Sequence, residues 1–141
     1  MADLEALIRL RRHTVEEKQK FLADLFRKAE VLEDRKRDLQ ERLKKERAVL
    51  EENPELETIT FYGPFESAMK QDIERLTEGI KKWDVRIQIA QDDVRNAFAE
   101  LKRVEIVDRR RKKEAAAKQK TKEAMELDEI GIEGYRRREK F

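Results

Sequence analysis

The sequence predicts an all-α protein, an antiparallel two-helix coiled-coil hairpin with a longer, protruding C-terminal helix. Apolar residues recur at alternating steps of four and three in both halves of the chain, and the only two prolines lie close together near the middle. Charged residues make up 47% of the chain and aromatic residues 6%. This composition suits long helices that bury a narrow apolar seam better than it suits a globular core.

The heptad spacing covers the two halves separately. From Leu4 to Leu50, charged residues occupy only a minority of the seam positions, and from Met69 to Val104 every seam position is apolar. A periodicity sustained over this length indicates a coiled coil and argues against a disordered charged chain. A parallel dimer of two broken helices is the alternative packing of the same pattern.

The predicted turn lies in the stretch EENPELETITFYGPFES, which begins at Glu51. Pro54 disfavours helical geometry in the preceding Asn53, so the first helix is expected to end there. Gly63 and Pro64 favour the start of the second helix, because proline fits the first helical position. We therefore expect a single domain over 1–141, with a first helix over about 3–52, a turn over about 53–64, a second helix over about 65–128 and a flexible tail over 129–141.

A register follows if Leu50 faces Met69, because every seam residue then meets a seam residue of the other helix. In this register the second helix pairs back to about Ala115, and the rest overhangs the first helix. A shift by one heptad would keep the same apolar pattern. The chosen register places Ala29 opposite Ala90, Arg11 opposite Asp108 and the stem of Lys36 beside Trp83.

Motifs for catalysis or metal binding are absent from the sequence. Cysteine does not occur and His13 is the only histidine, so thiolate and multi-histidine metal sites are excluded. No glycine-rich phosphate loop or nucleophile motif occurs, and the carboxylates lie on helix faces with no pocket to shift their pKa values. We expect no catalytic residue, no metal and no cofactor, and therefore not an enzyme.

Charge and hydropathy also limit the location and the partners. No segment approaches the roughly 18 apolar residues of a membrane span, and the N-terminus lacks the pattern of a secretory signal, so a cytoplasmic location is expected. The net charge is only +2, but a basic run extends from Arg109 to Lys113. No aromatic residue interleaves it, as single-strand binders require. An acidic protein surface is therefore favoured over nucleic acid, and a nucleic-acid-binding helical protein is the weakest alternative.

Two groups of residues are candidates for partner binding. In the second helix, Trp83 is either a seam residue or a partly exposed docking residue. Gly79 is either tolerated in the helix or leaves a flat spot for a partner helix. Beyond the paired region, an apolar segment with a basic end has the character of a segment that orders on a partner; it contains Leu127, Ile132 and Tyr135, followed by Arg136, Arg137 and Arg138.

The C-terminal segment also supports a family resemblance. The motif Leu127-Asp128-Glu129, followed by Ile132-Glu133 and Tyr135-Arg136, resembles the C-terminal pattern of the flagellar export protein FliJ family. The stretch LTEGI, residues 76–80, is similar to that family's helix just after the turn. The order of a first helix, a mid-chain turn and a longer second helix is similar over nearly the whole length.

The resemblance implies an antiparallel coiled coil in the cytosolic part of the flagellar type III export apparatus, similar to the central stalk of rotary ATPases. The implied partners are the hexameric export ATPase, the cytoplasmic domain of the export gate and export chaperones, with the inner membrane reached only through these partners. The implied role is to couple ATP hydrolysis to protein export.

The resemblance also assigns candidate residues to partners. Leu76, Gly79 and Trp83 would serve the gate, although this sequence has Asp72 and Ile73 where the family's pattern has an aromatic residue. The tail and its basic end would serve the ATPase. The alternatives are a generic coiled-coil scaffold or adaptor and an injectisome stalk protein.

Overall fold

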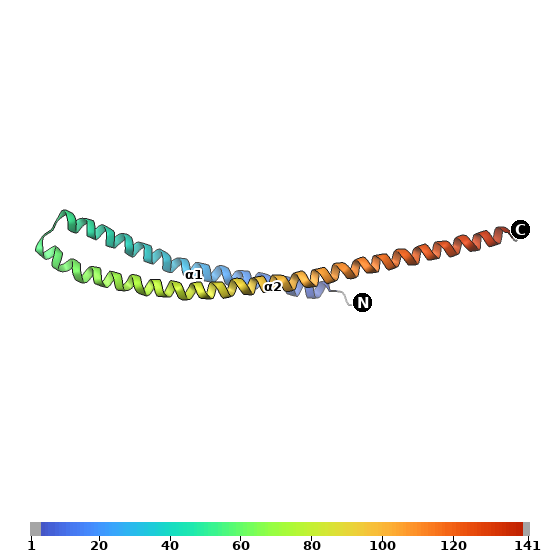
Figure 1. Cartoon of the computed structure of the whole chain (residues 1–141), viewed down its shortest axis with the longest axis horizontal. Helices are drawn as coiled ribbons and strands as arrows, with labels where there is room; N and C mark the ends of the chain where they lie inside the picture. The colour runs from blue at the N-terminus through green and yellow to red at the C-terminus, as the bar shows by residue number, and fades with distance from the viewer. Residues whose placement is uncertain (1–3, 140–141) are drawn as a thin grey trace. The chain divides into compact units, whose positions relative to one another are not determined.

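The fold is an all-α helical hairpin, as predicted. The computed structural model describes residues 4–139, with the side chains of 56–58 excepted. Helix α1 runs over Glu5–Glu52 and helix α2 over Leu56–Glu139, and no strand occurs among the described residues (Figure 1). Residue 3, the predicted start of the first helix, lies outside the described residues.

The chain packs as two compact units, which are described separately. The hairpin unit comprises residues 13–97, with the turn and the facing parts of α1 and α2. The terminal unit comprises the chain up to Arg12 and from Phe98 onward. That residues 1–141 form a single domain stays a prediction.

The turn is shorter than predicted. Only Asn53, Pro54 and Glu55 separate the helices, and the Glu55 amide donates a 2.8 Å hydrogen bond to the Asn53 carbonyl. This bond closes a three-residue turn centred on Pro54, whose fixed φ suits that geometry. The Glu55 carbonyl then accepts the first hydrogen bond of α2, from the Ile59 amide.

The prediction that the second helix starts near residue 65 is therefore wrong, because Pro64 lies inside α2. The physical reason is visible on the face of α2 that meets α1. Phe65 and Glu66 lie three and four residues after Tyr62. A helix that continues through Pro64 therefore places all three side chains on the face toward α1. Their contacts offset the backbone hydrogen bond that proline cannot donate.

These contacts join the two helices next to the turn. The Arg47 guanidinium donates a 2.7 Å hydrogen bond to the Glu66 carboxylate and a 3.3 Å bond to the Tyr62 hydroxyl. The Arg42 guanidinium lies 5.6 Å from the centre of the Phe65 ring. Hydrogen bonds from Lys70 and then from Arg47 hold the pKa of Glu66 below its ordinary value.

The core of the hairpin unit is a layer of seam residues. Leu25 and Ala29 of α1 pack with Ile87 and Ala90 of α2, and all four are buried. Each position lies on the predicted seams, so the heptad pattern identified the buried stripe correctly. Ridges of this spacing let two helices bury a narrow contact without a globular core.

The register, however, is shifted by about one heptad from the predicted one. A Cβ placed on Gly79 would lie 3.4 Å from the Leu32 Cδ1 atom, whereas the predicted register puts Gly79 opposite Gln40. Glu66 contacts Arg47, whereas the predicted partner was residue 53. The short turn explains the shift. With a connection of only three residues, the first residues to face each other across the two helices lie nearer to Pro54 than they would with the predicted twelve-residue turn.

The shift also changes the neighbours predicted for Trp83. Lys28, not Lys36, lies over its ring, with the ammonium 5.8 Å from the ring centre. Lys28 is about two helical turns from Lys36, as the change of register requires. Trp83 itself is half-buried against the core layer.

In the terminal unit, the N-terminal end of α1 packs on α2 around Leu101, which is 5% exposed. A 3.8 Å ion pair joins Arg12 to Glu105. Asp108, the predicted partner of Arg11, pairs with Lys112 at 3.0 Å. The Arg11 Nε is buried without a hydrogen-bond partner among the described residues.

Burial in this unit ends one heptad earlier than predicted, at Asp108 and not at Ala115. From Arg109 to Glu139 every residue of α2 is exposed. The helix nevertheless continues to Glu139, so the predicted helix end at residue 128 is wrong. The flexibility of residues 129–141 stays a prediction.

The register can be tested with disulfides, because the chain has no cysteine of its own. We expect Leu32→Cys with Gly79→Cys to form a bond within one chain on oxidation, since these positions are in contact. The matched pair Gln40→Cys with Gly79→Cys tests the unshifted register and should stay reduced. The reverse result, measured by thiol titration and gel mobility, would restore the unshifted register.

The ion pair at Glu66 should make stability depend on pH. A carboxyl whose pKa is lowered by folding stabilises the fold above its unfolded pKa, and this contribution is lost as the pH falls through the folded value. We expect Glu66→Gln to lower the melting temperature at pH 7, and the deficit to shrink as the pH falls below the ordinary value of 4.5. Glu41→Gln, an exposed glutamate of α1, is the control. A deficit that persists in acid would assign the effect to packing.

Candidate partner-binding surfaces

Trp83 lies at the edge of the hairpin core. It packs against the buried layer, and two cations approach its ring. The Lys28 ammonium lies 5.8 Å and the Arg86 guanidinium 5.0 Å from the ring centre. Cations over the face of a tryptophan are stabilised by its ring quadrupole. Trp83 is therefore a seam residue that stays partly exposed, and its role in docking a partner stays a prediction.

A groove of about 390 Å³ opens beside Trp83. Phe21 of α1 and Ile89 of α2 form its outer walls, and they are 57% and 58% exposed. Large apolar side chains this exposed, gathered around one groove, are typical of a protein-binding site. Lys28, Arg86 and Asp93 complete the charged part of the lining.

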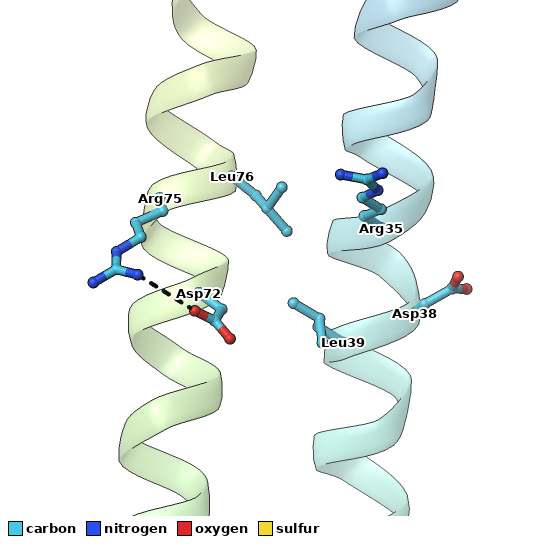
Figure 2. Close-up of a pocket in the computed structure, with 6 residues that line it drawn as sticks. All are labelled: Arg35, Asp38, Leu39, Asp72, Arg75 and Leu76. Atoms are coloured by element: carbon cyan, nitrogen blue, oxygen red, sulfur yellow. Dashed lines mark ion pairs between the residues drawn. The ribbon is translucent and has the colours of Figure 1, made fainter.

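Leu76 lies in a second groove, of about 400 Å³. Figure 2 shows Leu76 of α2 and Leu39 of α1 pointing toward each other between the helices. Asp72 and Arg75 form a 3.9 Å ion pair on the α2 rim. The α1 rim carries Arg35 and Asp38, so the groove has an apolar floor and rims of mixed charge.

Gly79 lies against α1. A Cβ at this position would touch the Leu32 side chain at an ordinary contact distance of 3.4 Å, so the helix that approaches it closely is α1 of the same chain. Its outer side borders a shallow groove of about 530 Å³. The charged residues Glu78 and Lys82 line this groove.

Leu76, Gly79 and Trp83 open onto the same side of the hairpin unit. Successive residues of a helix are 100° apart, and the three positions are separated by three and four residues. We call this side the Trp83 face. It is defined by Leu76, Gly79, Trp83, Leu39, Phe21 and Ile89 with the charged residues that line the same three grooves.

Phe21 and Leu39 were not among the predicted partner-binding residues. Leu39 looks like any seam position in the sequence, and Phe21 lies one residue off the seam. Ile89 is a second off-seam residue, exposed on the outside of α2. Off-seam apolar residues were the available signal, but the grooves that unite them depend on the register.

The predicted tail residues lie on the exposed part of α2. Leu127, Ile132 and Tyr135 are 68%, 53% and 64% exposed. The run Arg136–Arg138 occupies the last turn of α2, where cations are stabilised by the negative end of the helix dipole. We call residues 127–138 the C-terminal segment.

The described residues contain no group of three or more histidines, cysteines or carboxylates that could hold a metal ion. Among the same residues, no helix is both long and apolar enough to cross a membrane.

Comparison with known proteins matches the geometry described above. A family model described as "Flagellar FliJ protein" matches residues 1–140. Searches of curated proteins and of solved structures found no match. The family match covers almost all of the chain and supports a component of the flagellar export apparatus. The chain belongs to the FliJ family of flagellar proteins.

Proposed function

We propose that this protein is a stalk-like coiled coil that binds the hexameric export ATPase and the cytoplasmic domain of the export gate, and so couples ATP hydrolysis to protein export. Membership of the FliJ family supports a place in the flagellar export apparatus. One observation carries the finer proposal. The chain has two separate surfaces fit for partners, the Trp83 face and the C-terminal segment, and α2 contributes to both.

The C-terminal segment is the proposed site for the ATPase. Its apolar residues Leu127, Ile132 and Tyr135 are exposed, and no residue from Arg109 to Glu139 is buried. Burying them on a partner would gain roughly 1.5 kcal/mol or more for each side chain that is fully covered. The three arginines beside them would meet acidic groups of the ring and steer the encounter.

The Trp83 face is the proposed site for the export gate. It combines apolar groove floors at Leu39 and Leu76 with the accessible edge of Trp83. Partly exposed tryptophan and arginine side chains are common anchors of protein interfaces. Because this face belongs to the hairpin unit, it can bind one partner while the C-terminal segment binds another.

The location follows from these partners. We infer a cytoplasmic protein that associates with the inner membrane only through the export apparatus. Export chaperones are proposed as further partners on the basis of the family alone. A generic coiled-coil scaffold is the rival function, and direct binding to a purified export ATPase separates the two.

Deleting Leu127 to Phe141 should weaken binding to the ATPase ring at least about tenfold, since a loss of roughly 1.4 kcal/mol already has that effect. The melting temperature of the hairpin should stay unchanged, because residues 127–139 are all exposed. Added salt should slow association more than it speeds release. Titration of both forms against the ring at two salt concentrations measures these effects.

The control for this experiment removes three charges elsewhere on the exposed helix. Arg109→Gln, Arg110→Gln and Arg111→Gln together should weaken ring binding less than the loss of Arg136–Arg138 does. Equal affinity for the full-length and truncated chains would refute the assignment. A lower melting temperature on truncation would instead mean that the segment folds back onto the hairpin.

Replacing Glu78 and Lys82 with alanine should weaken binding to the cytoplasmic domain of the gate without changing the melting temperature. Both residues line the groove beside Gly79, and the Glu78 side chain is 68% exposed. The control variant, Glu41→Ala with Lys44→Ala, removes one acid and one base from exposed positions of α1. Isothermal titration measures the affinity of each variant for the gate domain. An equal loss of affinity in both variants would place the gate-binding surface elsewhere.

A further inference from the structure

The hairpin unit has a fourth groove, on the side of the seam away from the Trp83 face. It has a volume of about 460 Å³ and is bordered by α1 and α2. The α1 side supplies residues three and four apart, which therefore share one helix face. Its lining residues are Phe26, Ala29, Glu30, Glu33, Asp34 and Arg37 from α1 with Asp84 and Ile87 from α2.

This groove lies opposite the Trp83 face by helix geometry. Residues of α1 are 100° apart, so Phe26 and Glu30 point to one side of the seam positions Leu25 and Ala29. Phe21 and Lys28 point to the other side. We call this fourth groove the Phe26 groove. None of its lining residues borders the three grooves of the Trp83 face.

The floor of the Phe26 groove is apolar and rigid. Ala29 and Ile87 belong to the buried core layer, at 5% and 8% exposure. Phe26 stands beside them with 47% of its surface exposed. An apolar side chain from a partner would cover Phe26 and lie on a floor that is already packed, so little ordering of the hairpin would be required.

The rim of the Phe26 groove is acidic. The lining contains one guanidinium, that of Arg37, and four carboxylates, those of Glu30, Glu33, Asp34 and Asp84. Arg37 pairs with Asp34 at 3.2 Å. The other three carboxylates have no cation within ion-pair distance in the described part of the chain.

We propose that the Phe26 groove docks a basic amphipathic helix of a partner protein, with an apolar stripe on Phe26, Ala29 and Ile87 and flanking arginines or lysines on Glu30, Glu33 and Asp84. A third helix laid along two packed helices places its stripe in the groove between them. The charges select a basic helix and repel an acidic one. The proposal does not depend on the assignments of the ATPase or the gate.

The Phe26 groove of a second copy of this chain does not fit against the Phe26 groove of the first. A symmetric dimer would set one Phe26 groove against another, and the unpaired carboxylates of the two copies would then repel each other. A basic helix from a different protein removes that repulsion and neutralises the carboxylates. Charge complementarity therefore favours a helix from a different protein, with an apolar stripe between two rows of bases.

The test uses the full-length chain and a stapled helical peptide with a leucine stripe flanked by arginines. The second probe is the same peptide with glutamine in place of each arginine. Glu30→Gln with Glu33→Gln should weaken binding of the arginine peptide at least about threefold, as expected for two partly exposed charge pairs. Glu51→Gln with Glu52→Gln, the same charge change near the turn, should leave the affinity unchanged.

Amide chemical shifts of the labelled chain locate the bound peptide. We expect changes confined to residues 26–37 and 84–87, and the glutamine peptide should bind at least about threefold more weakly. Equal loss in both glutamine-substituted variants, or shifts centred on the turn or on the Trp83 face, would overturn the proposal. So would equal affinity of the two peptides, because the acidic rim would then select nothing.

Discussion

The short turn at Pro54 is the constraint on which the rest of the hairpin depends. A coiled-coil seam by itself allows shifts by whole heptads, so something else must select one. The ion pairs contribute little to the selection, because most join residues three or four apart on the same helix. Within the hairpin unit, Arg47 with Glu66 is a pair that spans the two helices, and it lies next to the turn. Turn and pair together determine which seam residues meet.

The heptad pattern was enough to predict the class of fold and the buried stripe. Leu25, Ala29, Ile87 and Ala90 lie where the spacing placed them. The turn could not be predicted from local propensity, because Gly63-Pro64 is a strong start signal that tertiary contacts override. A signal was available nonetheless. Stepping back from Met69 by three and four reaches Glu66 and Tyr62, which continue the seam toward the turn.

The candidate surfaces were only partly predictable for the same reason. Helix spacing alone puts Leu76, Gly79 and Trp83 on one side of α2. Which α1 residues join them depends on the register, and an error of one heptad replaces the whole set of neighbours. The C-terminal segment needed no register, because exposure follows from having no partner helix, and its apolar residues are exposed as predicted.

The two sides of the hairpin unit share one core but differ in charge. Beside Trp83, the groove is lined by two cations, Lys28 and Arg86, and one carboxylate, Asp93. In the Phe26 groove, four carboxylates outnumber the single guanidinium of Arg37. A narrow seam makes this possible, because each helix buries only a stripe and leaves its two flanks free to differ. A basic helix therefore meets fewer carboxylates beside Trp83 than in the Phe26 groove, so the two sides favour different partners. Two helices can therefore offer different surfaces to different partners on the two sides of one narrow seam.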